Sequence, residues 1–280
     1  MTYEQLWQRL TQLYDQGEAK AITRLVLYSR YGLSLADILC DKVGQLSLAA
    51  QQDLENIFAQ LEEAYPVQYV LGQSTFCGRS FVVDSSVLIP RPETEELCRW
   101  IADDGGRPHH LLDIGTGSGC IAVTLALEMA PDCHVTAWDI SPMALEVARN
   151  NAHRLGATID CHLCDVLTPP DDYDIWDVIV SNPPYICQQE AATMSPNVLG
   201  HEPHTALFVP DDNPLLFYQA IASYACRALR PGGLLYVELN PLYADRVEEL
   251  FTLHGLCCVQ LRCDQFGKVR FAKATKQLQQ

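Results

Sequence analysis

The tetrapeptide Asn182-Pro183-Pro184-Tyr185 combines residue types that can hold a planar nitrogen group. It follows a short apolar run, residues 178–180, which indicates a buried strand of a parallel sheet. The prolines end that strand because neither has an N–H to donate, and their rings fix the directions of the carbonyl acceptors. Asn182 adds an amide that donates and accepts, and Tyr185 adds a flat apolar face with a polar tip. These residues predict a rigid, acceptor-rich pocket for a carboxamide or an aryl amine.

A glycine-rich turn lies upstream of this tetrapeptide. Residues 110–114 read as a strand, and a helix follows the turn, whose residues are Gly115, Thr116, Gly117, Ser118 and Gly119. Glycine has no Cβ and accepts unusual φ angles, so a ligand can approach such a backbone closely. The spacing is GxGxG rather than the GxGxxG of dinucleotide-binding proteins. A nucleoside site is favoured, although a dinucleotide site stays open.

Three acidic residues follow the predicted strands in succession. Asp113 ends the first strand and is placed to brace the glycine turn, and Asp139 ends the second, 20 residues after Gly119. A carboxylate at that position accepts hydrogen bonds from a ribose diol, and Asp165 after the third strand can accept from an adenine amino group. A nucleoside beside a pocket for nitrogen favours S-adenosylmethionine as cofactor and methyl transfer as the reaction. Methyl transfer needs positioning and hydrogen-bond acceptors, so no metal is expected.

The periodicity of the chain predicts an α/β protein with an added helical part. Residues 1–65 show helical spacing, with Ser34 and Asp37 forming a capping box and Ser47 opening a longer helix. They predict a helical bundle that either packs as a module or docks a substrate protein. Pro66 is expected to end the helices, and the two-residue rhythm over 66–90 predicts a β-hairpin linker. Pro92 is expected to open a helix that carries Arg91 and Thr94 as a lip over the active site.

Residues 91–280 alternate between strand and helix patterns, which is typical of a doubly wound sheet. Ser141, Pro142 and Gly156 mark the start and end of one helix. Residues 186–213 read as a long polar loop, and Pro231-Gly232-Gly233 as a turn before a strand. The remaining expected strands cover 134–138, 159–163, 234–239, 257–263 and 269–272.

Composition excludes several classes of function. The formal net charge is −16, which argues against direct nucleic-acid binding, since that binding depends on basic side chains that neutralise phosphates. No apolar stretch approaches the length of a membrane span, and the N-terminus lacks a signal pattern. The 12 cysteines form no regular framework, so free thiols and a cytoplasmic location are expected.

These motifs resemble the PrmC/HemK family of class I, Rossmann-like methyltransferases. The resemblance covers essentially the whole chain and rests on three segments besides the glycine turn and the Asn-Pro-Pro-Tyr motif. They are Gly72 with Phe76-x-Gly78, Leu88-Ile89-Pro90-Arg91-Pro92-Glu93-Thr94-Glu95, and Glu202-Pro203-x-x-Ala206-Leu207. The resemblance implies methylation of N5 of the glutamine in the GGQ motif of peptide chain release factors, with S-adenosylmethionine as the methyl donor.

Carried over by position, the resemblance assigns the site residues. Residues 115–119, Asp139 and Asn182 would contact S-adenosylmethionine, and residues 182–185 would contact the glutamine. Separately from the resemblance, Asp113 is also expected among the cofactor-binding residues, and Arg91 among those that bind the substrate. The chain departs from the family pattern at three places. Val166, expected beside the cofactor, stands where some members have Trp, and Asn240 and Tyr243 replace a Gly and a Gln that often follow Glu238.

Three other functions are compatible with parts of the sequence. Asn-Pro-Pro-Tyr is shared with nucleic-acid adenine-N6 methyltransferases, which would carry a basic groove. A glutamine methyltransferase acting on a ribosomal protein is a nearer alternative. A non-catalytic adaptor is disfavoured because the glycine turn and the tetrapeptide are both present.

Overall fold

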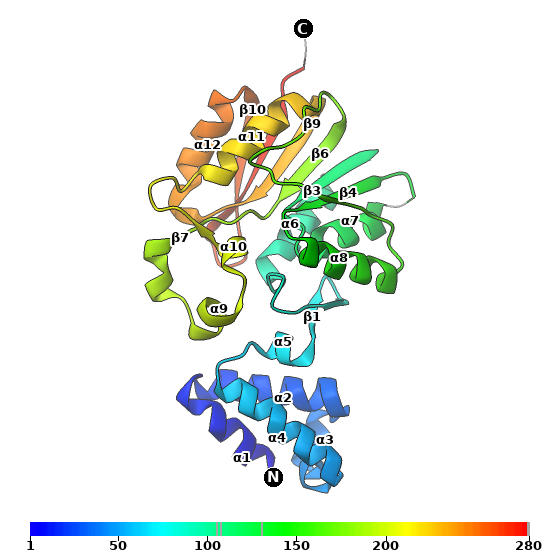
Figure 1. Cartoon of the computed structure of the whole chain (residues 1–280), viewed down its shortest axis with the longest axis vertical. Helices are drawn as coiled ribbons and strands as arrows, with labels where there is room; N and C mark the ends of the chain where they lie inside the picture. Colours follow the sequence, from blue (N-terminus) through cyan, green and yellow to red (C-terminus); the bar gives the residue numbers. More distant parts are fainter. Residues whose placement is uncertain (105, 107, 130, 279–280) are drawn as a thin grey trace. The chain divides into compact units, whose positions relative to one another are not determined.

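The computed structural model describes residues 1–104, 106, 108–129 and 131–278, and it divides into two compact units (Figure 1). The first unit comprises Met1–Gln73 and Met194–His201, and the second comprises Ser74–Thr193 and Glu202–Gln280. The last two residues of the predicted catalytic domain, 279 and 280, lie outside the described residues. Among the residues that are described, no helix has the length and apolar character that a membrane span requires.

The main part of the first unit is helical, as predicted. Its helices are α1 (Tyr3–Arg9), α2 (Gln16–Tyr31), α3 (Leu35–Leu39), α4 (Leu48–Glu62) and α5 (Val67–Leu71). The capping box of Ser34 with Asp37 and the Ser47 cap of α4 are confirmed. Their apolar faces bury a core that includes Leu6, Leu10, Val26, Leu54 and Phe58.

The prediction that Pro66 ends the helices is wrong. Pro66, with φ −57°, is the N-cap of α5, which closes at Gly72 in the left-handed conformation, φ 69°. A proline lacks only its own N–H, so it can precede a helix as well as end one. The predicted hairpin is confirmed in a shorter form, with β1 (Gln73–Phe76) paired to β2 (Arg79–Val82).

The second unit is built on a seven-stranded sheet in the order β10-β11-β9-β6-β3-β4-β5. The strands are β3 (His110–Ile114), β4 (His134–Asp139), β5 (Asp160–Leu163), β6 (Trp176–Ser181), β9 (Leu229–Glu238), β10 (Leu256–Cys263) and β11 (Val269–Lys276). Strands β5, β4, β3, β6 and β9 are parallel, and β11 runs antiparallel to both of its neighbours. The predicted turn at Pro231-Gly232-Gly233 is instead part of β9, beside a break in the register of β6 with β9.

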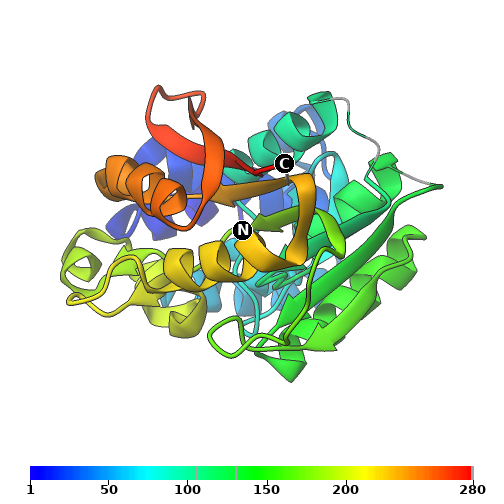
Figure 2. The same ribbon diagram turned by 90° about the horizontal axis from the view of Figure 1, so that it is seen from above.

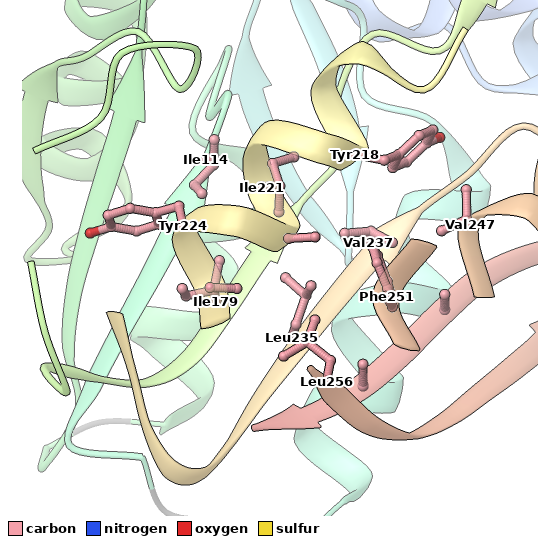
Figure 3. Packing of buried hydrophobic residues seen from close by; sticks show 14 of the residues in the cluster. Ile114, Ile179, Tyr218, Ile221, Tyr224, Leu235, Val237, Val247, Phe251 and Leu256 are labelled. Atoms are coloured by element: carbon pink, nitrogen blue, oxygen red, sulfur yellow. The ribbon is translucent and has the colours of Figure 1, made fainter. Parts of the chain in front are cut away.

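Helices cover both faces of this sheet (Figures 1 and 2). One face packs against α6 (Pro92–Asp103), α7 (Cys120–Met129) and α8 (Pro142–Leu155), and the other against α11 (Leu216–Ala228) and α12 (Ala244–Leu253). Alternate residues of each strand point to opposite faces. Leu111 therefore enters the first core of this unit, on the side of α6, α7 and α8, and Leu112 enters the second core, on the side of α11 and α12. Figure 3 shows the second core, where Ile221 and Phe251 pack over Ile179 and Leu235.

The predicted long loop at residues 186–213 contains short elements of regular structure. They are β7 (Ile186–Cys187), a 3₁₀ helix (Gln188–Thr193), α9 (Pro196–His201), α10 (His204–Leu207) and β8 (Phe208–Val209). Strands β7 and β8 pair in parallel through Ile186 with Phe208, although 22 positions separate these residues. Such a pairing cannot be recognised from local periodicity, because each strand is only two residues long.

The order of the strands decides where the two sequence motifs meet. The chain runs from β3 outward through β4 to β5, then returns to the other side of β3 for β6 and β9. Ligands of doubly wound sheets bind at the carboxyl ends of the strands, where this reversal occurs. Ile114 pairs with Ser181, so the glycine turn after β3 and the tetrapeptide after β6 begin side by side.

Candidate active site

A cavity of about 340 Å³ lies within the second unit, at the carboxyl ends of β3, β4 and β6. It is also lined by the segment before α6, through Leu88, Pro90 and Arg91, and by the segment around Pro203 and Ala206. Among the described residues, no three His, Cys, Asp or Glu side chains are grouped to hold a metal ion. All of the twelve cysteines are free, and Cys258 and Cys263 are exposed.

The glycine turn lines part of this cavity. Gly115, Gly117 and Gly119 have φ angles of 75°, 54° and 79°, which a side chain rarely accepts. The amides of Gly115 and Thr116 both donate to the carbonyl of Trp138, each at 2.9 Å. All five residues from Gly115 to Gly119 were predicted to contact a cofactor, and the first four of them line the cavity.

Asp113 lies beneath the turn and outside the residues that line the cavity. Its side chain is fully buried, and its Oδ2 accepts from the Thr116 hydroxyl at 2.7 Å and from the Ala122 amide at 3.2 Å. The structure therefore shows the bracing of the turn that the sequence suggested, while the expected contact of Asp113 with the cofactor stays a prediction. Burial raises the pKa of Asp113 to about 7, against the lowering effect of these two hydrogen bonds.

This raised pKa predicts how stability depends on pH. The folded protein holds the Asp113 proton up to about pH 7, whereas the unfolded chain releases it near 3.8. Stability contributed by the protonated group is therefore lost as pH rises through this window, by about 1.4 kcal/mol per pH unit. We expect urea unfolding from pH 5 to 7 to show this loss in the wild type relative to Asp113→Asn, which has no proton to release. Parallel pH curves for the two proteins would contradict the expectation.

The next two strands bring further predicted residues to the cavity. Asp139 at the end of β4, and Asp165 and Val166 after β5, all line it. Asp139 also accepts from the Gly117 amide at 2.8 Å and the Ser141 amide at 2.9 Å, so it ties the turn to the start of α8. Burial raises the pKa of Asp139, and these backbone hydrogen bonds oppose the effect. Two carboxylates along one wall fit the hydroxyl and amino groups of a nucleoside.

Ile140 is a lining residue that the sequence analysis missed. Its side chain is 60 % exposed although it is large and apolar, and it follows Asp139 directly. An exposed isoleucine beside a carboxylate can cover the apolar face of a base while the carboxylate binds the sugar. The signal that was available is the apolar residue next to the acid at the end of a strand. Val166 and Leu167 supply further apolar surface to the same cavity.

Only the first three residues of the tetrapeptide line the cavity. Asn182, Pro183 and Pro184 line the cavity, and the Asn182 amide Nδ2 donates to the Thr94 hydroxyl at 3.3 Å. Tyr185 is not among the lining residues, and its hydroxyl donates to Glu238 Oε1 at 3.0 Å. The expected aromatic wall formed by Tyr185 is therefore absent from the described cavity. Burial, with the nearby Glu238 charge, raises the pKa of Tyr185, so its hydroxyl keeps its proton.

Arg91 lines the cavity but is already paired. Its Nη2 donates to Glu202 Oε1 at 2.6 Å, and the other oxygen of Glu202 accepts from the Ile89 amide at 3.2 Å. Glu202 is buried, so this pair fastens the segment before α6 to the segment before α10. The guanidinium is predicted from the sequence to bind substrate, and in the structure its charge is balanced by a carboxylate of the same unit.

Asn240 and Tyr243, the two residues near Glu238 that differ from the family pattern, contact the end of the tetrapeptide and the chain that follows it. Asn240 Nδ2 donates to the carbonyl of Tyr185 at 3.2 Å and to the carboxylate of Glu190. The Tyr243 hydroxyl lies 3.3 Å from the Cys187 sulfur. Both replacements therefore contact the segment directly after the motif, without reaching the cavity.

Comparisons with known proteins agree with this architecture. Residues 108–266 match a family model described as a methyltransferase domain. A methyltransferase from Pyrococcus furiosus has a similar fold, with a TM-score of 0.51, 18% identity, and coverage of 82% of this chain and 99% of that one. A 16S rRNA methyltransferase of T. thermophilus gives a TM-score of 0.50 at 18% identity, over 73% of this chain and 50% of that one. These two likenesses bear on the fold alone.

Curated relatives are similar over almost the whole chain. The release factor glutamine methyltransferase of Bacteroides thetaiotaomicron is 42% identical, with 96% of this chain and 97% of that protein covered. The protein of the same name from Streptococcus pneumoniae is 40% identical, with 92% of each covered. The resemblance predicted from the motifs is confirmed, and the chain belongs to the family of release factor glutamine methyltransferases.

Proposed function

We propose that this protein transfers a methyl group from S-adenosylmethionine to the side-chain nitrogen, N5, of the glutamine in the GGQ motif of peptide chain release factors. The names of its relatives support the reaction and the substrate class. The observation that carries the proposal is that one cavity is lined both by the glycine turn after β3 and by Asn182, Pro183 and Pro184 after β6. A nucleoside site and an amide pocket within one cavity are what this transfer requires.

The residues around the glycine turn fit the cofactor. Gly115 and Gly117 let its polar groups approach the backbone, and Asp139 and Asp165 are placed to accept from its hydroxyl and amino groups. Ile140 and Val166 offer apolar surface to its base. This surface can take the place of the tryptophan that some family members have at the position of Val166. When bound, S-adenosylmethionine supplies a methyl group made electrophilic by its positively charged sulfur.

Asn182 and Pro183 are proposed to act on the substrate amide. A carboxamide nitrogen is a poor nucleophile because its lone pair is delocalised into the carbonyl. The Asn182 side-chain oxygen and the Pro183 carbonyl accept its two N–H groups and favour the pyramidal geometry that frees the lone pair. Pro184 stiffens the turn that holds both acceptors. Tyr185 contributes by anchoring the end of the motif to Glu238.

The helical part of the first unit, predicted as residues 1–65, is proposed to dock the release factor. Several of its large apolar side chains are exposed instead of entering the helical core, which supports a role in protein contact. They are Tyr28, Leu35, Leu39 and Leu48, which are 54–85 % exposed.

A methylation assay with two release factor substrates tests the function. The full-length protein is incubated with labelled S-adenosylmethionine and either a release factor or a copy whose GGQ glutamine is changed to alanine. We expect label on the first and none on the second, because the acceptor nitrogen is absent from alanine. Equal labelling of both would contradict the assignment of the substrate residue.

The same assay with DNA or RNA as the substrate distinguishes the proposed function from the main alternative. An adenine-N6 methyltransferase would label DNA or RNA in the same assay. The net charge of −16 makes phosphate contacts unfavourable, so we expect no label on nucleic acid. Label on nucleic acid with none on the release factor would replace the proposal.

A further inference from the structure

Glu238 links the first and last residues of the Asn-Pro-Pro-Tyr motif. It ends β9, the strand beside β6, where Ser181 pairs with Val237. Its side chain is buried, with 2 % exposure, and accepts from the Thr94 hydroxyl at 2.7 Å and from the Tyr185 hydroxyl at 3.0 Å. Thr94, in the first turn of α6, in turn accepts from Asn182 Nδ2 at 3.3 Å. A chain of hydrogen bonds thus runs from a buried carboxylate to the cavity.

The direction of these hydrogen bonds is fixed by chemistry. The Thr94 and Tyr185 hydroxyls each donate to one oxygen of Glu238, so the single hydroxyl proton of Thr94 is used in that bond. The Thr94 oxygen is then left as an acceptor, and the arm of the Asn182 amide that faces it must be the NH₂ group. The Asn182 oxygen, Oδ1, is thereby left to accept from a ligand in the cavity that Asn182 lines.

We propose that Thr94 and Glu238 are positioning residues that set which arm of the Asn182 amide faces the substrate nitrogen. The proposal rests on the function proposed above, in which that nitrogen belongs to a glutamine side chain. A free asparagine amide can rotate by 180°, because its oxygen and nitrogen arms have nearly the same shape. In the rotated form, the NH₂ group of Asn182 would face the NH₂ group of the substrate glutamine, and neither could accept a hydrogen bond from the other. The pair Thr94 and Glu238 excludes that form.

Hydroxyl donors and a cation around Glu238 oppose the effect of its burial. Burial raises the pKa of Glu238, while the Thr94 and Tyr185 hydroxyls and the charge of Arg270 lower it, and Glu93 acts to raise it. Arg270 is itself paired with Asp264 at 3.4 Å, which keeps the guanidinium in this part of the unit. A buried carboxylate with two donors and a nearby cation is satisfied without any partner from the cavity.

Two substitutions of Thr94 separate the role of its hydroxyl from that of its shape. Thr94→Val keeps the volume but offers Asn182 no acceptor and Glu238 no donor, whereas Thr94→Ser keeps the hydroxyl. We expect Thr94→Val to lower kcat on the release factor by about 10²-fold, with the KM for S-adenosylmethionine changed by less than about threefold. Thr94→Ser should restore kcat to within about fivefold of the wild type. Glu238→Gln should lower kcat by about tenfold, because its amide can present either arm to Thr94.

A control variant accounts for simple loss of stability. Tyr236→Phe removes another hydroxyl that donates to a carboxylate, that of Asp104, from the same strand but away from the cavity. We expect it to lower the melting temperature without a matching loss of kcat. A Thr94→Val variant with near-normal kcat, or a Thr94→Ser variant as slow as Thr94→Val, would overturn the proposal.

A nuclear magnetic resonance measurement tests the orientation of Asn182 without any substrate. In protein labelled with ¹⁵N-asparagine, the Asn182 side-chain NH₂ signal is identified by its loss in Asn182→Ala. We expect a nuclear Overhauser contact from that NH₂ to the Thr94 methyl group in the wild type, and its loss in Glu238→Gln. Absence of the contact in the wild type would overturn the inference even if the release factor is methylated, and its presence would support the inference even if another substrate is found.

Discussion

Asn182→Ala is expected to lower kcat for methylation of the release factor by about 10²- to 10³-fold while cofactor affinity changes little. The substitution removes the side-chain oxygen that accepts from the substrate amide, and it leaves the Pro183 carbonyl as the remaining acceptor. The turn should survive because Pro183 and Pro184 fix its backbone. Single-turnover transfer from labelled S-adenosylmethionine gives the rate, and calorimetric titration of the cofactor gives the affinity.

A neighbouring position supplies the matched control for this substitution. Gln188 lies six residues further on, is exposed, and also carries a side-chain amide. Gln188→Ala should keep the wild-type rate, because its amide does not line the cavity. If Asn182→Ala keeps normal turnover and still binds the cofactor, the role assigned to the Asn182 oxygen is wrong. A loss of cofactor affinity as large as the loss of rate would assign Asn182 to the cofactor instead.

Local signals in the sequence were sufficient to predict the alternating fold. The helix α8 begins at Pro142 with Ser141 as its N-cap and closes at Gly156 with φ 74°, as these three residue types indicate. The strand before the glycine turn was predicted with its observed bounds, His110–Ile114, since a short apolar run between turn residues has few other structures open to it. The order of two motifs along the chain then placed them at adjacent strand ends.

Contacts between distant parts of the chain were not accessible in this way. Glu202 meets Arg91 over 111 positions, and Tyr185 meets Glu238 over 53. The expectation that Tyr185 forms a wall of the pocket followed from its side-chain type, whereas its hydroxyl goes to a carboxylate on another strand. The prediction missed helix α5 for a different reason. Five residues are too few to show a helical period, and the spacing of Tyr69 and Leu71 fits the two-residue period of a strand as well.

Gly119→Ala is expected to lower both the free energy of unfolding and the affinity for S-adenosylmethionine. Gly119 has φ 79°, and an added Cβ would lie 3.1 Å from the Cβ and 3.2 Å from the Cα of Ala148. The left-handed conformation costs about 1–2 kcal/mol for alanine. The overpacking costs a further ~1–3 kcal/mol, because the backbone of α8 cannot move aside as a flexible side chain can. Moving the turn away from α8 would displace Gly115 and Gly117 from the cavity.

Gly267→Ala separates the two contributions to this loss. Gly267 has φ 80°, and an added Cβ would meet nothing within 4 Å, so only the conformational cost applies. Gly267 lies in the turn between β10 and β11, at the far edge of the sheet from the glycine turn. Urea unfolding should therefore show Gly119→Ala to be less stable than Gly267→Ala by about 1–3 kcal/mol. Calorimetry should show weaker cofactor binding for Gly119→Ala alone. Equal stabilities would mean that α8 yields to the added methyl group, and the close approach of Gly119 to Ala148 would then not be what requires glycine there.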